Sequence, residues 1–469
     1  MAVTTPGRLM GIMRLPRQQQ YADGATLASL LAATLLVIPS KMVVRGIPFS
    51  LTLASVVSLI AAMCWFCAQL TTNLGVAKGR TPVRTVAFVY ALANIMTYGY
   101  ANAGYLPSDE RGFADHRLVL ALALVGLAIA VCDGVRGVDR LDRVLKTIVV
   151  AGAIMGVIGS CQFLLDLDLT KYLQLPGLRP TSLDSAVLSR GAQNRVASTT
   201  GHPIEFGVVC AMMLPLAAHY GFNAKEEGKP ALRWWICTAL IGSGLFFSVS
   251  RSAVLCVVAI GLVLFLGWPT RRRLQAVLAA VASLAVMKVA SPGLTKTIYN
   301  LFANAGQDSS VQVRAHRYTQ AANEIRRHLF LGRGAGTWYY PKYNAFDNQY
   351  IMSMVETGLI GTAAFIAVFV VGMYAAARAR YMATDARTRD LGLALTASLL
   401  VPLVGAATFD LLAFGTVTGL AFLLLGCTGA LLRSVAETVP MEGDDRPMAW
   451  RISHRIDTVT DALARRVSH

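Results

Sequence analysis

The stretch WWICTALIGSGLFFSVSRSAVLCVVAIGLVLFLGW, residues 234–268, decides the fold class. It carries one charge, on Arg251, and is long enough for two short helices across a hydrocarbon core of about 30 Å. A charged side chain at the centre of a membrane helix costs about 3 kcal/mol, and less near the interface. We therefore predict a tight helical hairpin over this stretch, with Arg251 at its tip.

The whole chain has the same apolar character. Of its 469 residues, 55% are apolar and 15% are charged, whereas an ordinary soluble domain has about 25% charged residues. This composition excludes a soluble enzyme and a disordered chain. The net charge of +17 would suggest nucleic acid in a soluble protein, but in a membrane protein it reports topology and attraction to anionic lipid. We expect membrane lipid, and no nucleic acid, as a partner.

Twelve apolar runs predict an all-α, polytopic membrane domain over residues 1–432. The first run is better explained as a retained span than as a signal peptide, because a polar, basic segment precedes it and no small-residue cleavage site follows it. The runs lie near 24–40, 49–70, 85–105, 118–133, 147–166, 203–221, 234–250, 252–268, 274–290, 354–376, 391–408 and 411–432. The last two form one apolar stretch that Asp410 divides.

Lys and Arg test this count because they gather on the cytoplasmic side of membrane proteins. With the N-terminus inside, each inside segment holds at least three basic residues, and the short outside turns together hold five. An odd number of spans before any inside segment would break this alternation. The charges therefore predict that both termini are cytoplasmic.

Two long extracytoplasmic loops, about 167–202 and 291–348, are expected between the spans. Loops of this length usually carry function. Apolar residues at helical spacing within 311–329 predict an amphipathic helix on the outer membrane face. The basic tail, 433–469, is expected to be cytoplasmic, with an amphipathic helix over 447–468 on the inner leaflet.

Four groups of polar residues lie at the predicted outer boundary. Arginine suits phosphate because its planar fork donates two parallel hydrogen bonds, so three or four arginines together suggest a pyrophosphate ligand. The groups are Arg195 with Thr199, Thr200, His202 and Glu205; Ser250, Arg251 and Ser252; Arg314, Arg317 and Arg333; and Asp347, Asn348 and Tyr350.

Each arginine has a simpler explanation. Arg251 is either an anion ligand in a cavity or a hairpin tip that reaches lipid phosphate. Arg314 and Arg317, three apart on one helix face, could bind lipid headgroups. The glycines of Gly332–Gly336 either let the backbone approach a ligand or form a flexible turn.

The remaining polar groups are also open to two interpretations. His202 and Glu205 form either a polar pair at a helix start or part of a binding site. Asp347 and Asn348 either cap the tenth span or include a carboxylate that takes a proton from an incoming hydroxyl. The sequence contains no metal-binding constellation, and we expect neither metal nor cofactor.

These pieces, in this order, resemble the O-antigen ligase and polymerase superfamily of bacterial envelope glycan enzymes. The resemblance covers roughly residues 190–375. It rests on RVASTTGHPIEFG (195–207), the Ser-Arg-Ser hairpin (250–252), Arg314 with the helix leading to Gly332–Gly336, and Asn348-Gln349-Tyr350 through Glu356, Gly358 and Gly361.

The resemblance implies a bacterial plasma-membrane protein of about twelve spans. Such enzymes transfer a glycan from an undecaprenyl-pyrophosphate carrier to a hydroxyl of a glycan or lipid acceptor on the extracytoplasmic face, without a metal. It implies an inverting mechanism in which Arg251 and Arg314 hold the diphosphate, with Arg317 a close second to Arg314. Further expected substrate-binding residues are Arg195, His202, Glu205, Arg333, Asn348 and Tyr350.

The chain departs from the family at one position. Many relatives have His-Asn where this chain has Asp347-Asn348, and the family histidine is the proposed base. Asp347 replaces it as the catalytic carboxylate, or His202 or His316 takes its place, or the activity differs. The alternatives to an enzyme are a polytopic transporter or flippase of a lipid-linked or anionic envelope precursor, and a non-catalytic scaffold that binds envelope polysaccharide assembly proteins.

Overall fold

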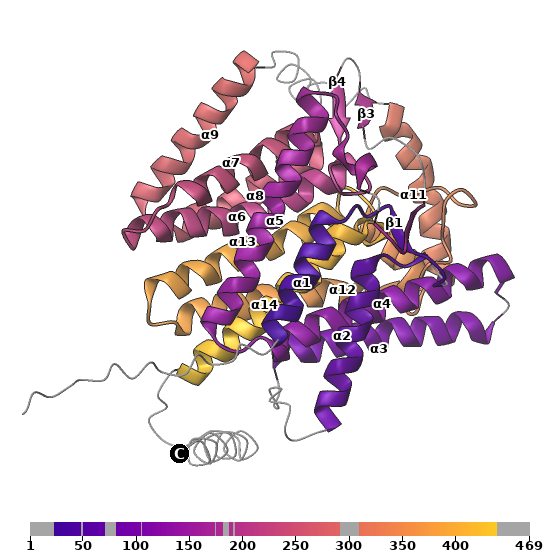
Figure 1. Ribbon diagram of the computed structural model, residues 1–469. Coiled ribbons are helices and arrows are strands. Elements are labelled where there is room, and N and C mark those ends of the chain that lie inside the picture. The colour runs from indigo at the N-terminus through magenta and orange to yellow at the C-terminus, as the bar shows by residue number, and fades with distance from the viewer. Residues whose placement is uncertain are drawn as a thin grey trace, which may run out of the picture.

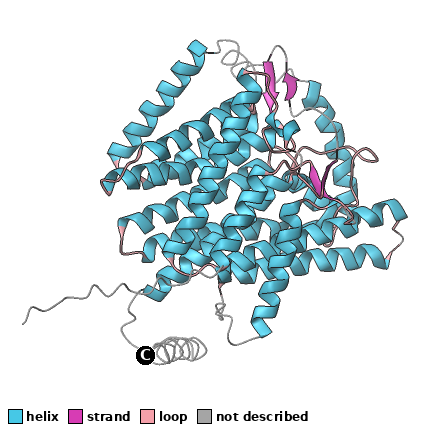
Figure 2. Ribbon diagram, in the orientation of Figure 1, coloured by secondary structure: helices cyan, strands magenta, loops and turns pink. Residues whose placement is uncertain are grey.

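The computed structural model describes residues 23–438, apart from 48–49, 71–80, 105, 174, 182–186, 191–192 and 291–308. The protein is mostly helical, and Figure 2 shows short strands only near one side of the bundle. The expected tail helix at 447–468 lies outside the described residues.

The helices follow the apolar pattern, and each of the twelve predicted runs coincides with one (Figure 1). They are α1 (Gly24–Val37), α2 (Leu53–Leu70), α3 (Pro82–Ala103), α4 (Ser108–Gly134), α5 (Val138–Leu164), α6 (Pro203–Glu226), α7 (Leu232–Phe247), α8 (Arg251–Gly267), α9 (Thr270–Ala290), α12 (Gln349–Met382), α13 (Ala386–Ala406) and α14 (Gly415–Thr438). A further helix, α11 (Ser309–Arg327), lies where the amphipathic helix was predicted.

Seven of the described helices are long and apolar enough to cross a membrane: α2, α4, α5, α6, α12, α13 and α14. The helices α1, α7 and α8 are apolar but shorter, with 14, 16 and 17 residues. The chain is therefore a multi-pass membrane protein. The count of twelve spans and the cytoplasmic position of both termini stay predictions.

Small strands, which the all-α expectation did not include, join two loops. Strand β1 (Met42–Val44) pairs antiparallel with β2 (Leu178–Pro180), and β3 (Val187–Arg190) pairs with β4 (Gln193–Val196). The β1–β2 pair fastens the short turn after α1 to the long segment after α5. Side-chain patterning missed it because three residues are too few to show a period of two.

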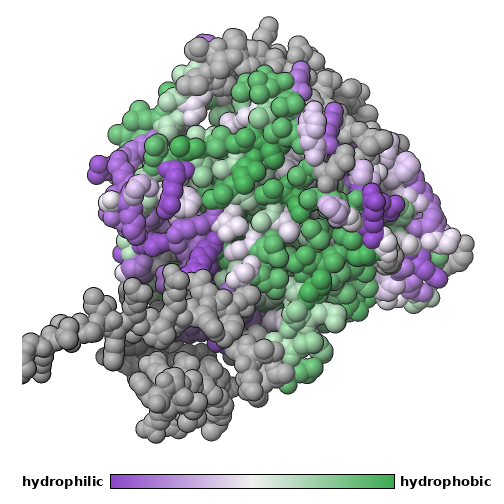
Figure 3. All heavy atoms as spheres, viewed as in Figure 1, coloured by the Kyte–Doolittle hydropathy of each residue, from purple (hydrophilic) through white to green (hydrophobic). Residues whose placement is uncertain are grey.

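The bundle is built around two buried helices. In α6 and α14, 89% of the most apolar window is buried within the protein, against 22% in α2, which lies at the periphery. Large side chains such as Phe206, Phe369 and Phe422 fill this core. Figure 3 shows apolar side chains across the middle of one face and hydrophilic ones toward both sides, as expected for a bundle that spans a bilayer.

Candidate functional site

The site lies at one end of the bundle, where the turns 38–47, 197–202, 248–250, 331–348 and 407–414 meet; we call this the loop end. It lies toward the right of Figure 1, near β1, β4 and α11. Backbone and side-chain hydrogen bonds join these turns, as between Ser40 N–H and the Thr199 carbonyl (2.8 Å) and between Asn348 Nδ2 and the Ala407 carbonyl (3.2 Å).

Helices α4, α6, α8, α12 and α14 all begin at the loop end. The N-terminus of a helix carries a partial positive charge and unpaired N–H groups, so such a position favours anions. The chain thus directs the positive ends of five helices to the same region in which the sequence places its arginines.

Glu205 is a structural anchor of this region. Its carboxylate is only 1% exposed and accepts hydrogen bonds from the N–H groups of Gly201 (2.9 Å), Thr416 (2.8 Å) and Val417 (3.1 Å). It therefore links the start of α6 to the first turn of α14. Thr416 lies 211 residues after Glu205, so local sequence patterns could not predict this contact.

His202 is the N-cap of α6. Its Nδ1 accepts a hydrogen bond from Ile204 N–H (3.1 Å), and its ring lies 5.8 Å from that of Phe414. Burial, together with the nearby positive charges of Arg195 and Lys41, lowers the pKa of His202 to about 4. The ring is therefore neutral at pH 7, as the accepting Nδ1 requires.

The Arg195 group and the Ser-Arg-Ser hairpin come together. Arg195 is 8% exposed and donates from Nε to the Ser248 carbonyl (3.3 Å). Ser250 caps α8 through its hydroxyl, which accepts from Ala253 N–H (3.4 Å), and Arg251 is the first helical residue. Two arginines far apart in sequence thus belong to one part of the loop end.

Of the other predicted arginines, Arg314 and Arg317 lie on α11, and Arg333 lies on the loop that follows it. Arg317 donates from Nη1 to the Ala345 carbonyl (2.8 Å) and lies 3.8 Å from the carboxylate of Asp347. The side chains of Arg314 and His316 lie outside the described part of the chain, so their distance from Arg251 stays a prediction.

Arg333 has a partner that the sequence did not reveal. Its Nη2 donates to both carboxylate oxygens of Glu110 (2.9 Å each), and Glu110 is 1% exposed in the first turn of α4. Lys342 Nζ and the Tyr343 hydroxyl each donate to Glu110 at 2.7 Å. These four residues, the Glu110 clamp, hold the loop 333–343 on α4.

Asn348 and Tyr350 position the start of α12. The side chain of Asn348 accepts from the N–H groups of Tyr350 (3.0 Å) and Ile351 (3.3 Å), as an N-cap does. The Tyr350 hydroxyl donates to the Leu403 carbonyl (2.6 Å), which ties α12 to α13.

Asp347 lies beside a second carboxylate, Asp410. The Oδ1 of Asp410 accepts from Asn348 N–H (3.0 Å), and Asp347 has a left-handed backbone with φ of 53°. Burial raises the pKa of Asp410 to about 6, and the neighbouring charge of Asp347 adds to the rise. The sequence offers a signal for this residue, because it is a lone carboxylate within a long apolar stretch, but this signal alone does not distinguish a functional group from a boundary between spans.

The glycine loop packs against a break in α12. Gly332 (φ +70°) and Gly358 (φ +63°) have backbones in contact, and a Cβ on Gly358 would lie 2.4 Å from the carbonyl carbon of Phe330. Arg333 N–H donates to Val355 and Gly334 N–H to Glu356, both at 2.9 Å. The glycines thus permit close approach of the chain to itself.

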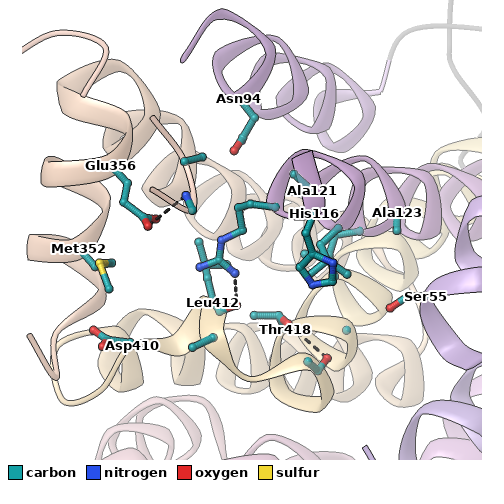
Figure 4. Close-up of a pocket in the computed structure, with 18 of the residues that line it drawn as sticks. Ser55, Asn94, His116, Ala121, Ala123, Met352, Glu356, Asp410, Leu412 and Thr418 are labelled. Carbon is teal, nitrogen blue, oxygen red and sulfur yellow. Dashed lines mark hydrogen bonds between the residues drawn. The ribbon is translucent and has the colours of Figure 1, made fainter. Parts of the chain in front are cut away.

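A cavity of about 480 Å³ lies beside this break (Figure 4). Residues of α1, α2, α3, α4, α12 and α14 and of the loop 335–345 line it. Figure 4 shows Glu356, Met352 and Asp410 along one wall and His116, Ser55 and Thr418 across from them. None of the nine predicted site residues whose side chains are described lines the cavity.

Within the described residues, no group of three or more His, Cys, Asp or Glu could hold a metal ion.

The fold and the polar loop end define a multi-pass helical membrane protein with a cavity at one end of its bundle. Residues 236–366 match the family described as O-antigen ligase. This match confirms, over that part of the chain, the resemblance expected from the sequence. Among curated proteins, none matches the chain. The matched segment includes Arg251, Arg333 and Asp347; Arg195, Glu205 and Asp410 lie outside it.

Proposed function

We propose that the protein is a membrane glycan ligase or polymerase that uses an undecaprenyl-pyrophosphate-linked donor. The family match supports the reaction class, and the loop end supplies the groups that the reaction needs. The donor's isoprenoid tail would remain among the helices, and the transferred glycan would face the extracytoplasmic side of a bacterial plasma membrane.

The donor diphosphate would bind the arginines of the loop end. Arg251 begins α8, and Arg317 lies near the start of α12, so both act together with helix N-termini. Arg314, on α11, completes the proposed set. As the bond between the anomeric carbon and the diphosphate oxygen breaks, negative charge grows on the leaving group, and these cations stabilise it.

A carboxylate would activate the acceptor. The acceptor hydroxyl attacks the anomeric carbon from the face opposite the diphosphate, its proton passes to a carboxylate, and the configuration inverts. Asp347 is the proposed base, with Asp410 beside it through the Asn348 N–H. Burial raises the pKa of Asp410, so the proton can pass on to this stronger base beside Asp347.

The observation that carries the proposal is the joining of Asp347, Arg317 and Asp410 at the start of α12. The Arg317–Asp347 distance is 3.8 Å, and Asp410 accepts from the residue that follows Asp347. The proposed proton acceptor thus lies next to a proposed phosphate-binding cation, and transfer from a diphosphate needs both groups.

The test is a gene deletion complemented with wild type, Arg251→Ala, Arg251→Lys or Arg327→Ala. Arg327 is the matched control, because its side chain is 70% exposed and pairs only locally with Glu324 among the described contacts. We expect R251A to lose surface glycan by about a hundredfold or more, R251K to restore part of it, and R327A to restore all of it. Wild-type glycan in R251A cells would refute the proposal.

The same cells test the transporter alternative. Loss of a ligase or polymerase leaves lipid-linked glycan on the outer leaflet, where a membrane-impermeant lectin added to spheroplasts binds it. Loss of a flippase leaves it on the inner leaflet, hidden from the lectin. Accumulation on the inner side alone would favour transport.

A further inference from the structure

The cavity at α12 has an apolar part formed by three helices. Leu31 and Leu35 come from α1, Leu124 and Leu127 from α4, and Leu423 from α14. These side chains lie in segments whose length or composition suits the membrane interior. Such a lining suits a hydrocarbon chain and offers no partner to a free sugar or an inorganic ion.

The other part of the cavity is polar. The carboxylates of Glu356 and Asp410 line it together with Asn94 and Arg117. Arg117 donates from Nη1 to the Leu412 carbonyl (2.6 Å) and acts electrostatically on both carboxylates. Glu356 is 4% exposed and is held by Gly336 N–H (3.0 Å). Two fixed carboxylates repel an anionic headgroup, but they accept hydrogen bonds from the hydroxyls of a sugar.

Aromatic rings complete the polar part. Trp338, Tyr339 and Tyr340 line the cavity from the loop 335–345. The Glu110 clamp fixes this loop, and Tyr339 stacks on Phe113 of α4 with ring centroids 4.0 Å apart. Aromatic faces beside carboxylates and an amide match the apolar faces and hydroxyls of a sugar ring.

We propose that this cavity is the acceptor site and that the acceptor is an amphiphile. Its apolar chain lies between α1, α4 and α14, and its sugar lies against Trp338, Glu356 and Asp410. The volume, about 480 Å³, is within the usual range for small-molecule sites. This assignment rests on the proposed function, because it makes Asp410 the contact between the acceptor hydroxyl and the base region.

The site is distinct from the arginine group proposed for the donor. Arg195, Arg251 and Arg317 do not line the cavity, whereas Asp410 lines it and also contacts the residue after Asp347. The two substrates would therefore meet at Asp347 and Asp410, with the acceptor on the α4 side and the donor on the α8 side.

The first experiment measures binding without catalysis. The full chain, in lipid nanodiscs, is labelled with decyl glucoside that carries a photoreactive diazirine on its alkyl chain, and the adducts are mapped by mass spectrometry. We expect adducts on α1, α4 and α14. Ala121→Trp, which fills the cavity, should reduce them about tenfold. Leu122→Trp is the matched control, because Leu122 lies on the same helix, is 38% exposed and is not part of the lining.

The second experiment measures transfer with a lipid-anchored acceptor. We expect A121W to raise the KM for this acceptor about tenfold and to leave the donor KM unchanged. Ala123→Phe, a smaller filling change in the same wall, should act in the same direction if A121W fails to fold. A rise in donor KM alone would overturn the assignment, and so would labelling that neither filling variant reduces.

Failure of the site and failure of the proposed function give different results. Wild-type protein that is labelled in the cavity but transfers no glycan would overturn the proposed function, and the acceptor role with it. Wild-type protein that transfers glycan but gains adducts only on other helices would overturn the site and leave the function standing.

Discussion

The two ends of the bundle hold their buried carboxylates in different ways. At the end opposite the loops, which we call the basic end, Asp390 binds Arg272 (2.7 Å) and His219 (2.7 Å), and Asp142 binds Arg387 (2.9 Å). At the loop end, the hydrogen bonds described for Glu205, Glu356 and Asp410 come mainly from backbone N–H groups, with the Thr416 side chain as a further donor to Glu205. The backbone groups are those of Gly201, Thr416 and Val417; of Gly336; and of Asn348.

This difference suggests what each end does. A buried side-chain ion pair, such as Asp390 with Arg272, fixes helices against one another and uses the arginine in doing so. At the loop end, backbone groups hold the carboxylates in place, and Arg117 acts on Glu356 and Asp410 through its charge. The Glu110 clamp is the exception at the loop end, and it holds a loop in place.

The largest effect is expected from Asp410→Asn, which keeps the shape and removes the charge. A neutral amide cannot take a proton, so transfer should fall about a hundredfold or more. In the wild type, burial and the charge of Asp347 raise the pKa of Asp410 to about 6, while the charge of Arg117 acts to lower it. The carboxylate is protonated at lower pH, so activity should fall as pH decreases through about 6.

The measurement is the pH profile of transfer by purified wild type and by D410N. The profile of D410N should lack the step near pH 6. A mutant with wild-type rate and an unchanged profile would contradict a role for Asp410 and would remove the main functional contrast between the two ends.

The next effect is on stability at the basic end. Arg272→Ala removes a guanidinium that is only 10% exposed and leaves Asp390 buried without that partner. Breaking such a pair costs about 3–5 kcal/mol. A thermal unfolding scan should show a large fall in Tm, with transfer per folded molecule unchanged.

Arg271→Ala is the control for this change, because Arg271 is the exposed neighbour on α9. Its Tm should stay near that of the wild type. If R272A instead kept its Tm and lost transfer, the basic end would have a catalytic or substrate-binding role, which contradicts the difference between the two ends described above.

A smaller effect is expected where the glycine loop meets α12. Gly358→Ala places a Cβ against Phe330 in a left-handed conformation, at a cost of roughly 1–3 kcal/mol. The clash displaces the segment 330–334, which hydrogen-bonds to Val355 and Glu356, so both Tm and transfer should decrease. Gly242→Ala, at a helical glycine with open space around it, should change neither. Equal behaviour of the two variants would show that this contact does not position the cavity.

The smallest effect is expected from His202→Asn. Asparagine caps helices well, and a cap contributes about 1 kcal/mol, so Tm should change little and transfer by less than about fivefold. His202→Ala, which removes the cap, should lower Tm further. If H202N lost transfer a hundredfold while folded, His202 would act chemically, in place of the histidine that this chain lacks at position 347.

Much of the fold could be predicted from local pattern. Each apolar run became a helix because a backbone in hydrocarbon has to satisfy its own hydrogen bonds. The amphipathic helix α11 and the turn between α7 and α8 at Arg251 were likewise predicted from spacing and charge, although α7 and α8 pack against α6 and not as a tight hairpin. Such features depend on neighbours a few residues apart, which the sequence displays directly.

The candidate site could be predicted only in part. Sequence order collected the arginines and the Asp347-Asn348 pair, and the family match supports the resemblance. The order of residues in the sequence could not show that Arg333 binds Glu110, 223 residues away, or that Asp410 lies beside Asp347. No local signal reports which carboxylate meets which partner.

By itself, then, the sequence determined a helical membrane protein with cations gathered at its turns, because hydrophobicity and charge act on each segment separately. Only the tertiary structure decided which of these groups anchor the fold and which line a cavity. That distinction depends on contacts between helices distant in sequence, such as α4 with the loop after α11 and α6 with α14. In those contacts a buried charge is either enclosed by partners or left facing a space for a ligand.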